Sequence, residues 1–264
     1  MVFDLSRLTN SELVAQIDYH DSLGSTSDRA LEVGAEDAAQ LPLLVLTEQQ
    51  TAGRGRSTNR WLTTDGALTF SLVLHAPADR LPPSRWPHVA LVAGVAVADA
   101  LSQFVPATAV QLKWPNDIYL NQRKAGGILS ESIPGWRDRL VVGIGINVNN
   151  RLDIAALTTT DIRKTATSLI EYDNIERDRT SVLLAILDEF DRRWSELFNS
   201  GFDPAAAAYR ERCLLTGKTV TIQPRPDETI TGLCRGIDPY GGLLIRTATG
   251  DQSIISGTVT SWEH

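Results

Sequence analysis

Residues 48–56 read Glu48-Gln49-Gln50-Thr51-Ala52-Gly53-Arg54-Gly55-Arg56 and directly follow an apolar run in this chain of 264 residues. Two glycines alternate with two arginines, so the backbone can adopt unusual angles while the guanidinium groups point at an anion. The stretch lacks the Gly-Lys-Ser/Thr ending of a Walker A loop, and it does not open a helix as a dinucleotide-binding Gly-x-Gly-x-x-Gly does. We expect a loop that binds phosphate or carboxylate; the alternative is a mobile, solvated surface loop.

A second segment, Lys113-Trp114-Pro115-Asn116-Asp117, ends one predicted strand and starts a hairpin. Proline cannot continue a strand ladder and it fixes the turn, so Asn116 and Asp117 are presented from a rigid strand end. This rigidity suits a ligand site, whereas the alternative is a plain Pro-Asn-Asp turn.

Lys124 follows the polar turn at residues 121–123 and precedes an apolar segment. A lysine at the mouth of a strand that leads inward can stabilise negative charge on a transferred group, although a lone lysine is usually solvated. Gly126 and Gly127 favour the functional interpretation, because paired glycines inside a strand mark a bulge or the close approach of a ligand.

The segment at residues 142–148 places Gly143, Gly145 and Asn147 on one face of a strand and apolar side chains on the other. The first face carries almost no side chains and ends in an amide, which leaves room for a flat ligand and supplies a donor and an acceptor. The alternative is close packing against a helix.

Two weaker signals are ambiguous. The hydroxyls of Gly24-Ser25-Thr26-Ser27-Asp28 are those of an ordinary helix cap. Trp61, just beyond the arginine loop, either stacks on a ligand or anchors the loop.

Hydrophobic periodicity predicts helices at residues 27–33, 86–105, 180–199 and 204–214, with a stop at Gly201. It predicts strands at residues 43–48, 68–75, 109–114, 118–120, 125–131 and 140–149. Helices and strands mix without strict alternation, which favours an α+β fold over a doubly wound one. After Gly217, short strands at residues 218–223, 229–236, 243–247 and 253–256 suggest a small β-barrel, so we expect domains at residues 1–214 and 215–264.

Composition excludes several classes of protein. A formal net charge of -7 argues against broad nucleic-acid binding. The two cysteines and four histidines have no spacing typical of a zinc site or a disulfide framework. The first residues are not a signal peptide, and the longest apolar run is too short to cross a bilayer. We therefore expect a cytoplasmic protein with no membrane partner.

Taken together and in this order, these segments resemble the biotin protein ligases, also called biotin-[acetyl-CoA carboxylase] ligases. The resemblance runs from about Asp18 to Asn149 and recurs more weakly at Arg235-Gly236-Ile237-Asp238. It implies a mixed-sheet catalytic domain related to class II aminoacyl-tRNA synthetases and lipoate ligases, followed by an SH3-like β-barrel. It also implies an enzyme that converts biotin and ATP to biotinyl-5'-AMP and pyrophosphate, and then biotinylates a lysine of a carrier domain, such as that of acetyl-CoA carboxylase, with release of AMP.

The resemblance also implies roles for individual residues. The biotin site would comprise Ser25, Thr26, Gln50, Gly53, Arg54, Lys124, Gly127 and Gly143. The nucleotide site would comprise Arg56, Trp61, Asn116, Asp117 and Asn147. Catalytic charge would come from Lys124, Arg56 and Arg54. Mg²⁺ would screen the pyrophosphate, with Asp117 as the one side chain singled out for it.

The chain departs from the family pattern at Ser27, where asparagine is common, and at residues 57–60, where many relatives are more basic. The Ser-Thr segment begins by residue 25, which leaves no room for the helix-turn-helix domain of some members, so we expect no DNA-binding or repressor role. The alternatives are a lipoate or octanoate ligase or transferase, whose pocket loop resembles Arg-Arg-x-x-Gly-Gly-Gly, and a non-catalytic biotin-binding sensor. Monomer and homodimer both stay open.

Overall fold

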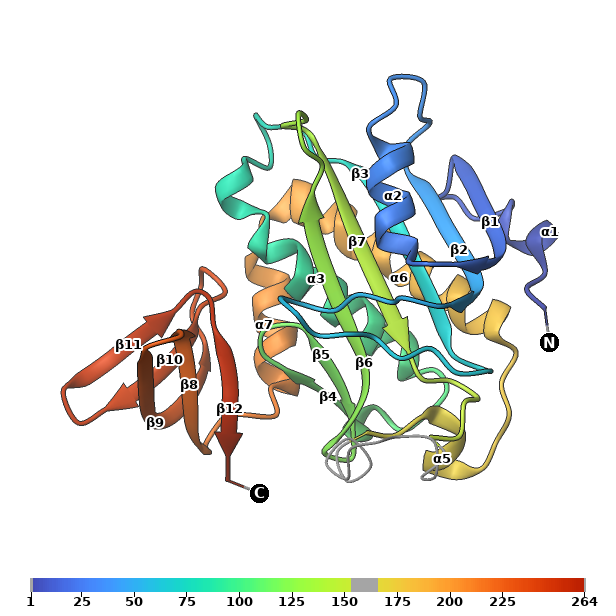
Figure 1. Ribbon diagram of the computed structural model, residues 1–264. Coiled ribbons are helices and arrows are strands. Elements are labelled where there is room, and N and C mark those ends of the chain that lie inside the picture. The colour runs from blue at the N-terminus through green and yellow to red at the C-terminus, as the bar shows by residue number, and fades with distance from the viewer. Residues whose placement is uncertain (1, 153–165, 264) are drawn as a thin grey trace.

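The computed structural model describes residues 2–152 and 166–263 (Figure 1). The helices are α1 (Leu5–Leu8), α2 (Thr26–Gly34), α3 (Pro87–Leu101), α5 (Leu169–Asp173), α6 (Arg179–Ser200) and α7 (Asp203–Arg212), with 3-10 turns η1 (Pro83–Arg85) and η2 (Ala107–Ala109). The strands are β1 (Gln16–Leu23), β2 (Leu43–Gln50), β3 (Leu68–His75), β4 (Val110–Lys113), β5 (Asp117–Leu120), β6 (Arg123–Ser132), β7 (Arg139–Ile146), β8 (Thr219–Arg225), β9 (Glu228–Ile237), β10 (Leu243–Thr247), β11 (Gly250–Ile254) and β12 (Thr258–Trp262).

The larger sheet has seven strands in the order β1-β2-β3-β7-β6-β5-β4. Strands β1 and β2 are parallel and the other neighbours are antiparallel, so the sheet is mixed. The α+β class expected from the sequence is confirmed.

Two layers of helix cover this sheet (Figure 1). Helices α3 and α6 pack on one face, where Leu68, Phe70 and Leu72 of β3 join the main apolar core. Helix α2 packs on the other face, where Val73 and Val141 join a smaller apolar cluster. Because side chains alternate along a strand, Thr69 and Ser71 face the α2 side. The α2 face therefore changes along β3 from apolar to polar, and the polar part is where the site lies.

Several local predictions are confirmed. Helix α6 ends at Ser200 and Gly201 has a φ of 77°, as expected of a helix stop. The lysine hairpin turns through Asn121 and Gln122, both with positive φ. Strand β6 is bulged at Ala125, because Tyr119 of β5 pairs with Lys124 while the preceding Ile118 pairs with Gly126.

Other elements were missed or displaced. The sequence patterns did not predict β1, β12, α1 or α5, and the strand expected at residues 253–256 begins earlier, at Gly250. Strand β1 lies at the sheet edge and none of its side chains is fully buried, so it lacks the apolar alternation that marks an interior strand.

The C-terminal unit is an antiparallel sheet of five strands in the order β11-β10-β9-β8-β12, as its all-β pattern predicted. It packs against the unit that contains the seven-stranded sheet, since the indole of Trp114 donates to the Gly241 carbonyl at 3.0 Å. Its SH3-like character and the boundary between residues 214 and 215 stay predictions; Leu214 and Leu215 are both buried at the junction. Cys213 and Cys234 are free thiols.

Within the described ranges, no helix is both long enough and apolar enough to cross a membrane.

Candidate active site

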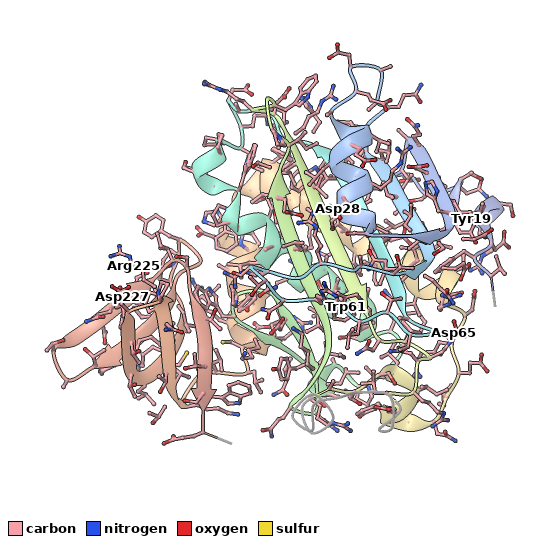
Figure 2. The ribbon with its side chains drawn as sticks, in the orientation of Figure 1. Tyr19, Asp28, Trp61, Asp65, Arg225 and Asp227 are labelled. Carbon is pink, nitrogen blue, oxygen red and sulfur yellow. The ribbon has the colours of Figure 1, made fainter. Side chains whose placement is uncertain are left out.

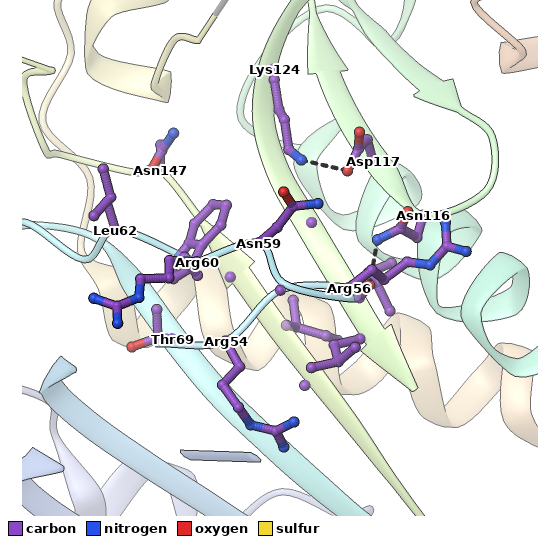
Figure 3. A pocket seen from close by; sticks show the side chains of 18 of the residues that line it. Arg54, Arg56, Asn59, Arg60, Leu62, Thr69, Asn116, Asp117, Lys124 and Asn147 are labelled. Atoms are coloured by element: carbon purple, nitrogen blue, oxygen red, sulfur yellow. Dashed lines mark hydrogen bonds and ion pairs between the residues drawn. The ribbon is translucent and has the colours of Figure 1, made fainter. Parts of the chain in front are cut away.

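A cavity of about 920 Å³ opens on the α2 side of the large sheet. Its walls come from the segment between β2 and β3, from strands β3, β6 and β7, from the Lys113–Asp117 segment and from the start of β12. This volume lies within the usual range of about 300–1,000 Å³ for ligand pockets. Figure 3 shows the cavity from close by.

The structure brings most of the predicted site residues to this one cavity. Those that line it are Thr26, Gln50, Arg54, Arg56, Trp61, Asn116, Asp117, Lys124, Gly127, Gly143 and Asn147. Ser25 and Gly53 are not among the lining residues. The Ser25 hydroxyl caps α2 by accepting from the backbone N–H of Asp28, which is the helix-cap alternative, and Gly53 accepts from the backbone N–H of Trp61.

The arginine loop folds into a hairpin that lies across the sheet (Figure 1). Gly53 accepts from the Trp61 N–H at 2.9 Å, and the Gly55 N–H donates to Asn59 at 2.8 Å. The Trp61 ring covers Gly145 of β7, where a Cβ atom would lie 2.5 Å from a ring carbon. Figure 2 shows Trp61 over the large sheet. The base of the loop at Gly53 and Trp61 is therefore packed onto the sheet, whereas residues 57–60 are exposed. The Trp61 indole N–H is buried without a partner among the described residues.

Arg54 is paired with two carboxylates. Its two terminal nitrogens donate to Glu131 at 2.8 and 2.7 Å, and its Nε lies 2.7 Å from Asp28 Oδ1. The hydrogen bonds to Glu131 are the main reason that the pKa of Arg54 is raised. In Figure 3 the side chain points away from Lys124. A role for Arg54 toward phosphate stays a prediction.

Arg56 has only neutral polar partners. Its Nη1 donates weakly, at 3.4 Å, to Asn116 Oδ1 and to the Gly257 carbonyl of the C-terminal unit. In the described parts of the chain, no carboxylate lies within 4.0 Å of this guanidinium. Burial lowers the pKa of Arg56, and Asp117 opposes that effect. The charge is therefore available to an anion in the cavity.

Asp117 is the carboxylate around which two lysines gather. Lys124 Nζ donates to Asp117 Oδ1 at 2.6 Å, and Lys113 Nζ lies 4.0 Å from Oδ2. Lys113 is only 8% exposed, and this burial lowers its pKa. With Arg56 nearby, three cations share one carboxylate, so this end of the cavity carries a surplus of positive charge suited to phosphate.

The described side chains of the site do not form a coordination sphere for the predicted magnesium ion. Among residues 2–152 and 166–263, no group of three or more histidine, cysteine, aspartate or glutamate side chains is arranged to hold a metal. The one candidate, Asp117, already accepts from Lys124. Magnesium commonly binds substrate phosphates while keeping several waters. An ion used here would therefore have to arrive on the triphosphate.

The opposite end of the cavity carries neutral groups. Gln50 Oε1 accepts from the Thr26 N–H at 2.7 Å and from the Thr26 hydroxyl at 3.1 Å. The Ser71 hydroxyl donates to Thr26 Oγ1 at 2.9 Å and lies 3.2 Å from Ser27 Oγ. Gly143 has no room for a side chain, because a Cβ atom would collide with Ser27 Oγ. This end suits an uncharged ring that both donates and accepts hydrogen bonds.

Asn147 lines the cavity, but its amide is already engaged. Its Nδ2 donates to the Thr167 carbonyl and its Oδ1 accepts from Asn150, both at 3.0 Å. Its predicted contact with adenine stays a prediction, and it would require a second bond from the same amide.

Sequence reasoning missed several lining residues. Thr69 could have been found, because it is a polar position of a largely apolar strand. It shares one face with Ser71, which lies behind the lining and bonds Thr26. Lys113 belonged to a segment that was singled out, yet no role was given to it. Thr258 and Val259 of the C-terminal unit also line the cavity, and no local signal points to them.

Comparisons with known proteins agree with this geometry. Residues 20–149 match the model of the biotin/lipoate A/B protein ligase family, and residues 216–260 match that of the biotin protein ligase C-terminal domain. The chain is 34% identical to the bifunctional ligase/repressor BirA of Bacillus subtilis, over 91% of this chain and 72% of that protein. It is 31% identical to a biotin-[acetyl-CoA-carboxylase] ligase of Mycobacterium tuberculosis, over 92% and 88%.

A solved structure is also similar: the biotin protein ligase of Aquifex aeolicus in complex with biotin and ATP. It has a TM-score of 0.79 and 30% identity, covering 94% of this chain and 99% of that one. The fold, the two-ended cavity and these matches lead to one conclusion: the chain belongs to the biotin protein ligase family.

Proposed function

We propose that this chain activates biotin with ATP and transfers it to a lysine of a biotin carrier domain of a carboxylase. The observation that carries the proposal is the division of one cavity into a cationic end and a neutral, hydrogen-bonding end. A triphosphate needs the first, and the ureido ring of biotin needs the second. A pure biotin-binding sensor would have no use for the cations at the phosphate end.

In the first step, a biotin carboxylate oxygen attacks the α-phosphorus of ATP. The new bond joins that oxygen to the α-phosphorus, the bond to the bridging oxygen breaks, and pyrophosphate leaves. Negative charge spreads over the phosphoryl oxygens, so fixed cations accelerate the step more than a general base would. Arg56 and Lys124 supply this charge, and Asp117 orients the Lys124 ammonium through its bond of 2.6 Å.

In the second step, the amine of a carrier lysine attacks the acyl carbon of biotinyl-5'-AMP. A C–N bond forms, the bond between the acyl carbon and the phosphate oxygen breaks, AMP leaves, and the amine gives its surplus proton to solvent. No covalent enzyme intermediate is needed. The hairpin that carries Arg54 and Arg56 shields the mixed anhydride from water.

The two free cysteines suit a reducing compartment, and we place the protein in the cytoplasm on this ground.

The direct test supplies the purified chain with ATP, magnesium and either biotin or lipoate, and measures pyrophosphate release and then labelling of a biotin carrier domain. A carrier whose target lysine is replaced by arginine is the control for the second step. We expect pyrophosphate release and carrier labelling with biotin and neither with lipoate. Turnover with lipoate and none with biotin would identify lipoate ligation as the function instead. Absence of pyrophosphate release with either acid would refute the ligase function.

A further inference from the structure

Lys113 is a buried cation to which neither reaction step described above assigns a role. It is the last residue of β4, lines the cavity and is 8% exposed. Its ammonium donates no hydrogen bond to any residue of the described ranges, and its distance of 4.0 Å from Asp117 is at the limit of an ion pair. A buried ammonium without hydrogen bonds is costly to keep. An anion in the cavity would offset this cost.

The nearest aromatic partner of Lys113 comes from the other unit. Its Nζ lies 4.5 Å from the centroid of the Trp262 ring, at the end of β12. The same ring packs edge-on against Tyr119 of β5, with centroids 6.3 Å apart. An aromatic face attracts an ammonium electrostatically. Unlike a carboxylate, it does not neutralise the positive charge and leaves the N–H donors free for another partner. The contact therefore fixes Lys113 and leaves its charge available.

Strand β12 contacts the phosphate end of the cavity at both of its ends. The Gly257 carbonyl, just before the strand, accepts from Arg56, and Thr258 and Val259 line the cavity. At the far end, Trp262 holds Lys113. Asp117 does not pair with both lysines equally, because Lys124 Nζ lies 2.6 Å from its carboxylate and Lys113 Nζ lies 4.0 Å from it.

We propose that Lys113 is a third cationic ligand of the ATP phosphates and that Trp262 is its positioning residue, so that the C-terminal unit completes the nucleotide site. The proposal rests on the ligase function above and adds a residue pair to it. Burial lowers the pKa of Lys113, as expected of a cation whose anionic partner is a substrate.

The test is a double-mutant cycle with Lys113→Met, Trp262→Leu and the two combined. For each variant, kcat and KM for ATP and for biotin are measured in adenylate formation, and the second step is measured separately with supplied biotinyl-5'-AMP and carrier. We expect each single variant to lower kcat/KM for ATP about 10-fold or more, as loss of one phosphate cation does. KM for biotin and the second step should change little.

Because Trp262 acts through Lys113, the combined variant should be no worse than Lys113→Met alone. Trp262→Phe keeps an aromatic face and should recover most of the activity. Trp136→Leu is the matched control, since Arg139 lies 3.5 Å over that ring in another cation–π pair and Trp136 does not line the cavity. It should leave kcat/KM for ATP unchanged.

Multiplying effects of the two substitutions would overturn the proposal, because Trp262 would then act independently of Lys113. So would an equal loss in both steps with a lowered Tm, which is the result of a merely structural role. An inactive wild-type protein would instead refute the ligase function itself, so the two failures are distinguishable.

Discussion

Arg54 and Glu131 form a bidentate pair across the cavity, although they are 77 positions apart in the sequence. Arg54 belongs to the hairpin that covers the sheet and Glu131 to β6 of the sheet itself. Asp28, at the start of α2, adds a second carboxylate at 2.7 Å. The guanidinium thus ties the hairpin to two elements that bound the cavity, and we infer that it fastens the covering loop.

Glu131→Gln should loosen this loop. The amide keeps one acceptor but turns an N–H₂ group toward the guanidinium, so one charged hydrogen bond of the pair is lost. Biotinyl-5'-AMP should then escape about 10-fold faster, which corresponds to the loss of one such bond. Escape is measured by trapping released adenylate in the absence of carrier.

The matched control is Glu196→Gln, which removes the same kind of bond from Arg193 on α6, away from the cavity. Equal escape rates in wild type and Glu131→Gln would show that the pair does not hold the loop.

Lys124→Met should slow adenylate formation about 100-fold or more, because it removes a fixed positive charge from the phosphoryl group in transfer. Asp117 would then have only the more distant Lys113 as an ion-pair partner. Its carboxylate would therefore place poorly compensated negative charge beside the phosphates. Biotin-dependent exchange of labelled pyrophosphate into ATP measures this step. Lys218→Met, outside the cavity in the C-terminal unit, is the control, and near-normal exchange in Lys124→Met would remove Lys124 from the proposed site.

The sequence predicted much of this site because its signals are local. Glycines two apart on a strand, a proline at a strand end and a lysine after a polar turn each constrain the backbone within a few residues, and each proved to line the cavity. Strands β3 and β10 were predicted with the bounds that the structure shows, because apolar periodicity is strong in buried strands.

What the sequence could not predict depends on contacts between distant segments. Arg56 bonds Gly257 across 201 positions, and Trp262 meets Lys113 through a strand that no pattern revealed. Arg54 was expected to face substrate, yet two protein carboxylates pair with it, and neither carboxylate lies near it in the sequence. Charge partners of this kind appear only when the fold is known.

Substitutions at Gly143 and Gly145 should affect the binding of biotin and of ATP separately. A methyl group at Gly143 would collide with the Ser27 hydroxyl, whereas one at Gly145 would lie 2.5 Å from the Trp61 ring. Gly143→Ala should therefore raise KM for biotin, and Gly145→Ala should raise KM for ATP, each by about 10-fold or more, as a displaced ligand contact does. Steady-state kinetics with one substrate varied at a time measures both.

Gly94→Ala is the control for this pair, because a methyl group there makes only ordinary contacts, the nearest at 3.6 Å. If the two cavity variants raised both KM values alike, the assignment of biotin and nucleotide to separate ends would be wrong.

The pH dependence of ATP binding should show that Lys113 is a ligand of the phosphates. Burial lowers the pKa of Lys113 below the ordinary lysine value of 10.5, and a bound phosphate would raise it again, because the phosphate stabilises the charged form. Affinity should then be full below the pKa of the free protein and fall as pH rises through it, so the loss begins below pH 10.5. Lys113→Arg keeps its charge through this range, so its affinity should stay flat after other titrations are subtracted. Calorimetry with ATP in the absence of biotin gives both profiles, and Tm at each pH checks that the protein is folded. Parallel profiles for the two proteins would mean that Lys113 does not contact the phosphates.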